Sequence, residues 1–288
     1  MMRRSFWRPL RRRLALGLPT VLGLARRGFF IPYRYAGMLE GRRGRDTHPV
    51  AAALLAAEQD AFAAALDALA DFTAAFAAIA ADRKPGAPRF DQDWFPRLDA
   101  AMAYAMVRQR RPRRLVEIGS GHSTRFFARA VADGGLDTVI TAIDANPRAD
   151  ISRLPITVLR ELVPRCGFGP FEILERGDLL SIDASHILMP GTDVDFMLCT
   201  VLPRLPAGAV VQIHDIFLPD GYPAEWAWRG YNEQLGIAAL VAGGGWRPLF
   251  SSHWVVSRMA DRVARSAVSG LPLVPGARES SLWLERRG

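Results

Sequence analysis

Carboxylate and imidazole side chains recur where four apolar runs of this chain end. The runs are 114–118, 138–143, 179–182 and 209–214, and the side chains at their ends are Glu117, Asp144, Asp183, His186, His214 and Asp215. In an open α/β sheet, ligands bind outside the carboxyl ends of the strands. Acids and imidazoles gathered there can hold a cationic or hydroxylated ligand and transfer its protons. This clustering is the main evidence for a catalytic site.

The first of these runs leads into a glycine turn, Gly119 to Thr124. Glycines let the backbone turn tightly and approach a ligand closely, and the helix that follows offers free N–H groups. A dinucleotide fingerprint needs Gly or Ala three residues after its second glycine, where this chain has Thr124. Glu117 also suits a cationic ligand better than a diphosphate. S-adenosylmethionine carries a sulfonium and an ammonium group and no phosphate, so we predict that cofactor.

Asp144 ends the second apolar run, where it can accept hydrogen bonds from both ribose hydroxyls of a nucleoside. A turn-forming Asp before Ala-Asn-Pro is the alternative interpretation. The glycine pattern alone is weak evidence, and it becomes moderately specific together with Glu117 and Asp144.

The elements that must position these side chains begin at Arg114. Short apolar strands alternate there with helices, which predicts a doubly wound parallel α/β sheet. The expected strands are 114–118, 138–143, 156–162, 179–182, 209–214 and 246–251, with one more at 281–285. The expected helices are 94–109, 122–133, 168–176, 193–204, 231–242 and 254–267.

The sequence before this sheet divides into a basic, aromatic leader (1–48) and a long Ala-rich helix with a linker (49–88), ahead of a catalytic domain at 89–288. Residues 1–45 hold twelve arginines and one acid, so the rest of the chain is slightly acidic although the net charge is +8. The apolar stretch 14–25 is too short to span a bilayer. Peripheral membrane contact through residues 1–30 and packing on the protein body both remain open.

Apolar residues recur at threes and fours over 49–82, which predicts one helix with a packing stripe. That stripe could face the body or a second subunit, as in a homo-oligomer. The two cysteines, Cys166 and Cys199, form no metal or disulfide pattern and are expected to be buried thiols in the reducing cytoplasm. Since no nucleic-acid module is recognisable, we expect no nucleic-acid partner.

The motifs around these strand ends resemble those of class I S-adenosylmethionine-dependent methyltransferases. They are Val-Glu-Ile-Gly-Ser-Gly-His-Ser-Thr, Ile-Asp, Gly-Asp-Leu-Leu-Ser-Ile-Asp-Ala-Ser-His and Ile-His-Asp-Ile-Phe-Leu-Pro, beginning at 116, 143, 177 and 213. The likeness covers roughly 90–288 and is greatest to a bacterial subfamily with Ile-Asp-x-Ser-His and His-Asp-Ile-Phe signatures. It implies a Rossmann-like sheet of seven strands whose last strand is antiparallel.

The resemblance also implies site residues. It puts Glu117, Gly119 and Gly121 at the methionine end of the cofactor and Asp144 on its ribose. We assign Ser120, His122, Ser123 and Asp183 to the same binding set, although His122 could only shape the turn.

Methyl transfer to a hydroxyl requires an aligned acceptor and removal of its proton. We expect His186 to be the base, with His214 as second choice and Asp183 beside them. Alternatively, Asp183, His214 and Asp215 could hold a divalent metal ion that activates the acceptor. An imidazole in this set disfavours Mg²⁺ and suits a softer ion. In a third interpretation, both imidazoles only cap their strands.

We therefore predict a methyltransferase that acts on the oxygen of a small hydroxylated acceptor, such as a saccharide or secondary metabolite. The stretch 226–234 is rich in aromatic and polar residues and could form the acceptor wall or a packing loop. A nicotinamide-dependent oxidoreductase is the alternative enzyme. A catalytically silent protein that binds a cofactor or a membrane surface is the third possibility.

Overall fold

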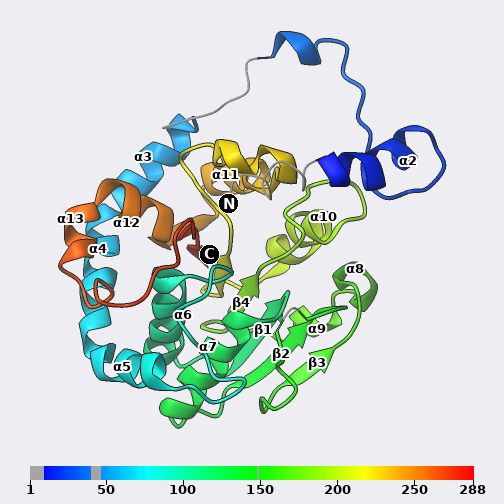
Figure 1. Ribbon diagram of the computed structural model, residues 1–288. Coiled ribbons are helices and arrows are strands. Elements are labelled where there is room, and N and C mark those ends of the chain that lie inside the picture. Colours follow the sequence, from blue (N-terminus) through cyan, green and yellow to red (C-terminus); the bar gives the residue numbers. More distant parts are fainter. Residues whose placement is uncertain (1–9, 40–46, 148) are drawn as a thin grey trace. The chain divides into compact units, whose positions relative to one another are not determined.

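The computed structural model describes residues 10–39, 47–147 and 149–288 (Figure 1). The chain divides into two compact units. The smaller comprises residues 1–43 and 223–230, and the larger comprises residues 44–222 and 231–288. Part of the predicted lipid contact at 1–30 lies outside the described residues, since these begin at Leu10.

A seven-stranded sheet with the order β3-β2-β1-β4-β5-β7-β6 forms the centre of the larger unit (Figure 1). The strands are β1 (Arg114–Ile118), β2 (Val139–Ile143), β3 (Thr157–Leu159), β4 (Leu179–Ile182), β5 (Val210–Ile213), β6 (Trp246–Ser251) and β7 (Leu282–Arg286). Strands β1 to β5 pair in parallel, and β7 is antiparallel to β5 and β6. The predicted Rossmann-like, doubly wound sheet with an antiparallel last strand is confirmed.

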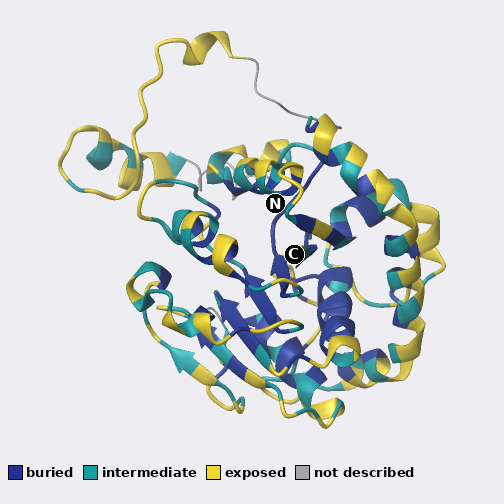
Figure 2. Cartoon of the chain, turned by 180° about the vertical axis from the view of Figure 1, so that it is seen from behind, coloured by how far each residue is buried: buried dark blue, intermediate teal, exposed yellow. Residues whose placement is uncertain are grey.

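The central strands are mostly apolar because both faces of the sheet are covered. Every residue of β4 and β5 is buried (Figure 2), as expected of parallel strands inside an α/β fold. From β1 the chain runs outward to β2 and β3 and then returns to β4 on the other side. This reversal of strand order opens a crevice between the carboxyl ends of β1 and β4, where such folds bind ligands.

Helices α6 (Arg97–Arg110) and α7 (His122–Asp133) pack against each other beside the sheet (Figure 1). Helix α6 begins at Arg97, later than expected, because Pro96 in extended conformation precedes it. The remaining elements after β3 are α8 (Val163–Cys166), α9 (Gly169–Glu172), α10 (Asp193–Phe196), η4 (Met197–Val201), η5 (Leu202–Arg204), α11 (Glu233–Ala242), α12 (Ser252–Arg258) and α13 (Ala260–Ala264).

The helix expected at 49–82 is interrupted. It consists of α3 (Pro49–Ala57), α4 (Gln59–Asp67), η3 (Ala68–Phe72) and α5 (Thr73–Ala81). The breaks fall at Glu58 and Phe72, whose φ angles of −102° and −109° leave the helical range. Its apolar stripe is nevertheless buried within this chain, through Phe62, Leu66, Leu69, Phe76 and Ile79.

Residues 59–81 are also long and apolar enough to cross a membrane by length and composition. The stripe residues named above are at most 1% exposed. About a third of the apolar window is buried, 33% in all. A helical segment with one buried stripe is typical of packing on a folded body.

The described part of the smaller unit contains η1 (Arg13–Gly17), α2 (Leu18–Val21), η2 (Ala36–Met38) and η6 (Ala224–Arg229). The expectation that both cysteines are buried was wrong. Cys166 is half-buried and Cys199 is exposed, because Met197 and Val201 are the residues of η4 that turn inward.

Candidate active site

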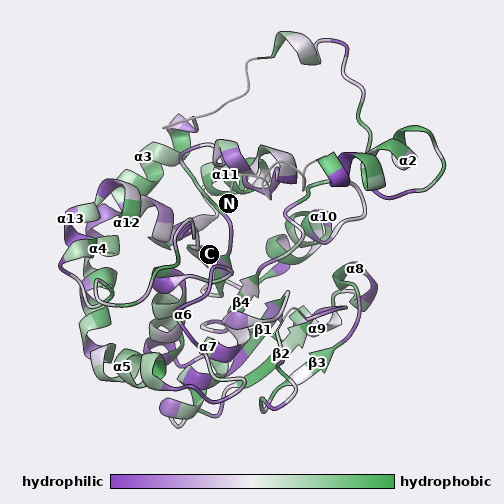
Figure 3. Cartoon of the chain, viewed as in Figure 1, coloured by the Kyte–Doolittle hydropathy of each residue, from purple (hydrophilic) through white to green (hydrophobic). Residues whose placement is uncertain are grey.

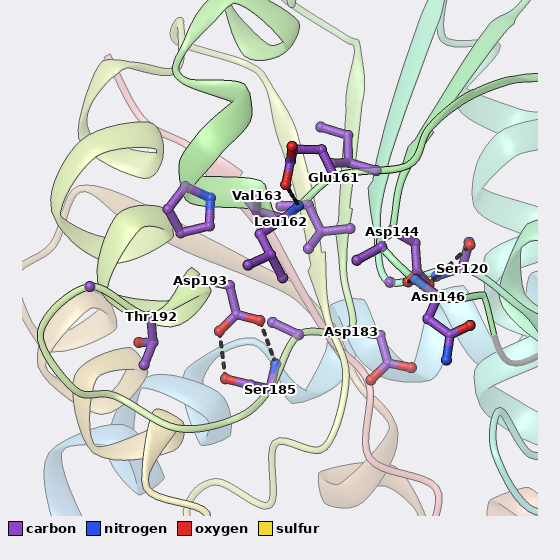
Figure 4. Close-up of a pocket in the computed structure, with 17 residues that line it drawn as sticks. Ser120, Asp144, Asn146, Glu161, Leu162, Val163, Asp183, Ser185, Thr192 and Asp193 are labelled. Carbon is purple, nitrogen blue, oxygen red and sulfur yellow. Dashed lines mark hydrogen bonds between the residues drawn. The ribbon is translucent and has the colours of Figure 1, made fainter. Parts of the chain in front are cut away.

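A cavity of about 580 Å³ lies at the carboxyl ends of β1, β2 and β4 (Figure 4). Its lining comes from the turn after β1, the segment 161–164 after β3, and the start of α10. The charged side chains among the described residues that line it are four carboxylates, with no Lys, Arg or His: Asp144, Glu161, Asp183 and Asp193. The cavity is therefore suited to a cationic ligand and poorly suited to a phosphate.

Gly119 begins the turn after β1 and lies beside Asp183, the first residue after β4. Its φ is +72°, in the region that favours glycine. A Cβ atom at this position would lie 2.0 Å from the carbonyl oxygen of Asp183. Only glycine therefore allows the ends of the two strands to approach this closely beside the cavity.

Asp144 lies across the turn from Gly119, and hydrogen bonds from the turn hold its carboxylate in place. Its Oδ2 accepts hydrogen bonds from the Ser120 backbone N–H at 2.7 Å and from Ser120 Oγ at 3.1 Å. Its Oδ1 accepts the Asn146 N–H at 2.8 Å. The carboxylate is thus held at the cavity wall (Figure 4) with lone pairs left for further donors.

Only part of the predicted cofactor set lines this cavity. The lining includes Gly119, Ser120, Asp144 and Asp183, and it lacks Glu117, Gly121, His122 and Ser123. Gly121 is the N-cap of α7, where its N–H donates to Thr124 Oγ1 at 2.8 Å. Burial, together with the positive charge of Arg125 and Arg89, lowers the pKa of His122 to about 4, so this imidazole is neutral at pH 7.

Glu117 lies beneath the turn and is fully buried. Its carboxyl accepts hydrogen bonds from Ser123 Oγ at 2.6 Å and Thr124 Oγ1 at 2.5 Å. Burial raises its pKa to about 8, although these hydrogen bonds oppose the shift. Glu117 thus ties β1 to the first turn of α7 and is largely protonated at neutral pH.

We expect Glu117→Gln to remove a pH-dependent loss of stability. The folded protein keeps this proton up to about pH 8, whereas an unfolded Glu releases it near its ordinary pKa. Stability from this group is therefore present at low pH and lost as pH rises, by roughly 3 kcal/mol between pH 5 and pH 8. The free energy of unfolding should be measured in urea at both pH values. Relative to the wild type, the variant should be more stable at pH 8 than at pH 5. The exposed Glu172→Gln is the control, and equal pH slopes for wild type and Glu117→Gln would contradict the prediction.

His186 follows β4 and is buried between carboxylates from three segments. Its Nδ1 lies 2.9 Å from Glu233 Oε2, at the start of α11. Its Nε2 lies 3.2 Å from Asp183 Oδ1 and 3.5 Å from Asp215 Oδ2. Asp183 is the most exposed member, with 27% of its side chain accessible, and it also lines the cavity. It therefore connects the buried imidazole to the predicted cofactor site.

His214 follows β5 and contacts two of the same carboxylates, Asp183 and Asp215. Its Nδ1 lies 3.5 Å from Asp215 Oδ1 and 3.8 Å from Asp183 Oδ1. Its Nε2 lies 3.3 Å from Oδ2 of Asp99, a fully buried residue in the first turn of α6. Asp99 in turn accepts the backbone N–H groups of Ser280 and Ser281, at 2.9 and 3.0 Å. The six side chains form one network, called the His–carboxylate cluster below: Asp99, Asp183, His186, His214, Asp215 and Glu233.

Charge in this cluster favours protonated imidazoles. Burial alone would lower the pKa of His186, but its hydrogen bonds with Asp183 and Glu233 raise that pKa well above the usual value. The pKa of His214 is raised in the same way by Asp215, Asp183 and Asp99. The two imidazoles hold the pKa of Asp183 well below its usual range, against the effect of burial.

Two backbone positions in the cluster are strained. His186 and Asp215 have φ angles of +60° and +58°, and Arg111 is the only other non-glycine residue with positive φ in the described chain. Such conformations cost free energy and persist where the surrounding structure fixes them, often at functional sites. The His186 carbonyl is fixed by the N–H groups of Asn232 and Glu233, at 3.1 and 3.3 Å.

The metal set predicted from the sequence, Asp183, His214 and Asp215, is brought together in this cluster. In the part of the chain that the structure describes, however, no group of three or more His, Cys, Asp or Glu side chains is arranged to hold a metal ion.

Sequence reasoning missed Asp99 and Glu233. Asp99 lies among the buried apolar residues of α6, and a lone acid on an apolar helix face was the available signal. Glu233 belongs to the stretch 226–234, which drew attention for its aromatic residues. That stretch is divided: Trp226 and Trp228 belong to the smaller unit, whereas the Tyr231 ring lies 4.5 Å from the ring of His186.

Comparison with known proteins supports a methyltransferase domain. Residues 116–216, from β1 to just beyond β5, match the family model described as a methyltransferase domain. No curated protein matches the chain.

Several solved structures are similar at low identity. A methyltransferase from Podospora anserina is 15% identical with a TM-score of 0.44, over 91% of this chain and 100% of its own. The O-methyltransferase TomG from Streptomyces achromogenes is 16% identical with a TM-score of 0.38, over 66% and 80%. An O-methyltransferase from Bacillus cereus is 18% identical with a TM-score of 0.37, over 64% and 82%. Similarity at this level carries no argument about substrate.

Proposed function

We propose that this protein is an S-adenosylmethionine-dependent methyltransferase. It transfers the methyl group to the oxygen of a small hydroxylated acceptor, such as a saccharide or secondary metabolite. We expect it to act in the cytoplasm, where free cysteines stay reduced. The observation that carries the choice of cofactor is the charge of the cavity.

Four carboxylates and no basic side chain among the described lining residues fit a ligand with a sulfonium and an ammonium group. A nicotinamide dinucleotide would bring a diphosphate to the same wall, where like charges repel. The family match to a methyltransferase domain supports the same choice. The oxidoreductase alternative is therefore disfavoured on two independent grounds.

The residues present fit the cofactor as follows. Asp144, fixed by Ser120, accepts the ribose hydroxyls. Leu162 and Val163, which follow β3 and line the cavity, provide an apolar surface for adenine. Gly119 and Asp183 face the methionine end. When bound, the cofactor supplies an electrophilic methyl group.

The protein's remaining task is to orient the acceptor and take its proton. In our proposal Glu233 accepts the Nδ1–H of His186 and so leaves Nε2 as the basic nitrogen, facing Asp183 at the edge of the cavity. The acceptor hydroxyl binds beside Asp183 and passes its proton to Nε2. Asp183 and Asp215 then stabilise the imidazolium that forms.

Base function requires neutral His186, and the carboxylates raise its pKa. The neutral fraction therefore grows as pH rises, and turnover should increase from neutral to alkaline pH. His214 remains the second candidate for base. Metal-assisted deprotonation through Asp183, His214 and Asp215 remains the alternative mechanism.

Calorimetric titration tests the cofactor. The wild type should bind S-adenosylmethionine and show no comparable affinity for NAD. Asp144→Ala should weaken binding of S-adenosylmethionine by roughly 10- to 100-fold, because two hydrogen bonds to the ribose are lost, each worth about 1 kcal/mol or more. Asp150→Ala is a control, since this exposed carboxylate lies outside the lining. Preferential binding of NAD would reject the proposed function, and unchanged affinity of Asp144→Ala would reject its ribose contact alone.

A further inference from the structure

Residues 10–39 of the leader are exposed or half-buried along their whole length (Figure 2), and many of their large apolar side chains are exposed. None of these residues is buried. Thirteen of the twenty exposed large hydrophobic residues of the described chain lie here: Leu14, Leu16, Leu18, Val21, Leu22, Leu24, Phe29, Phe30, Ile31, Tyr33, Tyr35, Met38 and Leu39. Exposed apolar surface on this scale marks an interaction site.

The same segment is purely basic. It contains six arginines and no Asp or Glu: Arg11, Arg12, Arg13, Arg26, Arg27 and Arg34. Across residues 10–39, 47–147 and 149–288, none of these guanidinium groups forms an ion pair with a carboxylate. The partner of this surface should therefore be both anionic and apolar.

The helical part of the segment suits an interface. Residues 10–21 are helical, and Figure 3 shows hydrophilic and hydrophobic residues side by side in this part of the chain. Three consecutive arginines precede the apolar residues Leu14, Leu16 and Leu18. A helix of this length cannot span a bilayer, whereas a short basic and apolar helix can lie in the headgroup region.

A cavity of about 240 Å³ within the smaller unit combines both properties. Its lining includes Arg12, Arg13 and Arg27 as well as Leu16 and Val21. The chain folds back to form it, since the Arg27 N–H donates to Thr20 Oγ1 at 3.1 Å.

The indole ring of Trp228 also lines this cavity, and the Arg12 guanidinium lies 5.5 Å from its centroid. Trp is enriched where apolar and polar phases meet at a membrane. A cavity lined by both guanidinium groups and apolar side chains fits a phosphodiester with the first methylenes of its acyl chains.

We propose that residues 10–39, with Trp228, bind the surface of a membrane that contains anionic phospholipid. Its arginines contact headgroup phosphates and its leucines enter the acyl boundary. A second copy of this chain is disfavoured, because it would bring six further arginines against these six. Nucleic acid is disfavoured, because a phosphate backbone leaves the leucines in water. The proposal is independent of the methyltransferase function.

Co-sedimentation of the full-length protein with phosphatidylcholine vesicles, with and without 30% phosphatidylglycerol, tests this. Binding should be at least about tenfold stronger with phosphatidylglycerol and should weaken in high salt. Leu14→Asn/Leu16→Asn/Leu18→Asn should reduce binding about tenfold or more, because three inserted side chains are lost. Arg11→Gln/Arg12→Gln/Arg13→Gln should reduce the preference for the anionic lipid about tenfold or more, because three of the six arginines of the segment are lost.

The matched control is Val139→Asn/Ile173→Asn/Leu235→Asn, which removes three exposed apolar side chains from the larger unit and should leave binding unchanged. Absence of vesicle binding, or equal binding to neutral vesicles, would overturn the proposal. Self-association of the wild type in sedimentation velocity, if the leucine variant lacks it, would also overturn the proposal. Stronger binding to DNA than to the vesicles would do the same.

Discussion

His186→Gln should lower turnover by roughly 10²- to 10⁴-fold, the usual contribution of a general base. Affinity for S-adenosylmethionine should stay within about twofold, because His186 does not line the cavity and glutamine can still donate a hydrogen bond to Glu233. Single-turnover methylation of a responsive acceptor separates the two effects. Turnover equal to that of the wild type would reject the base, and His214→Gln would then be tested in the same assay.

His253→Gln is the matched control. His253 is half-buried, whereas His186 is buried, and like His186 it pairs with an acid, Asp220, at 2.7 Å. It belongs to α12 and lies outside both the cavity and the His–carboxylate cluster. Its loss should leave turnover unchanged, which separates the chemistry of His186 from the general effect of removing a histidine–carboxylate pair.

The pH profile distinguishes a base from a structural histidine. Glu233 raises the pKa of His186 through the bond at Nδ1. Glu233→Gln removes that carboxylate charge, so the rise of turnover with pH should move to lower pH. A structural role would lower stability and leave the inflection of the pH profile where it is.

Exhaustive chelation should leave the activity of the wild type and of these variants intact. Loss of activity that only a divalent ion restores would favour the metal alternative.

The sheet could be predicted because its information is local. Each central strand is a short, mostly apolar run, as expected of strands buried on both faces, with single buried polar residues at Glu117, Ser181 and Gln212. The helical stripe at 49–82 was visible for the same reason. Its breaks at Glu58 and Phe72 could not be predicted, because neither residue type is a helix breaker.

The site was predictable only where it coincides with strand ends. Five of the site residues follow strands, directly or within four residues, so topology brings them to one edge: Asp144, Asp183, His186, His214 and Asp215. Asp99 and Glu233 come from helices, and no spacing in the sequence relates α6 or α11 to that edge. Whether an acid such as Glu117 faces a cavity or lies beneath it also depends on side-chain direction. The sequence of a strand shows that neighbouring side chains point to opposite faces of the sheet, but it does not show which face borders the cavity.

Gly119→Ala should lower affinity for S-adenosylmethionine by about 100-fold or more, as expected when a binding edge shifts by about 1 Å. A methyl group here would lie 2.0 Å from the Asp183 carbonyl oxygen, which is backbone and cannot rotate away. The ends of β1 and β4 would have to separate, and this would move Asp183 relative to Asp144. Calorimetric titration and thermal unfolding measure the two consequences.

Gly177→Ala isolates the steric effect from backbone strain. Gly177 has a φ of +85°, close to that of Gly119, yet a Cβ atom there meets nothing within 4 Å. Both variants should lose about 1 kcal/mol from the left-handed conformation, and only Gly119→Ala should lose the cofactor. If Gly119→Ala fails to fold while Gly177→Ala folds, the clash is still the cause, since the strain is common to both. Equal cofactor affinity in the two variants would show that cofactor binding does not depend on the close spacing of the ends of β1 and β4.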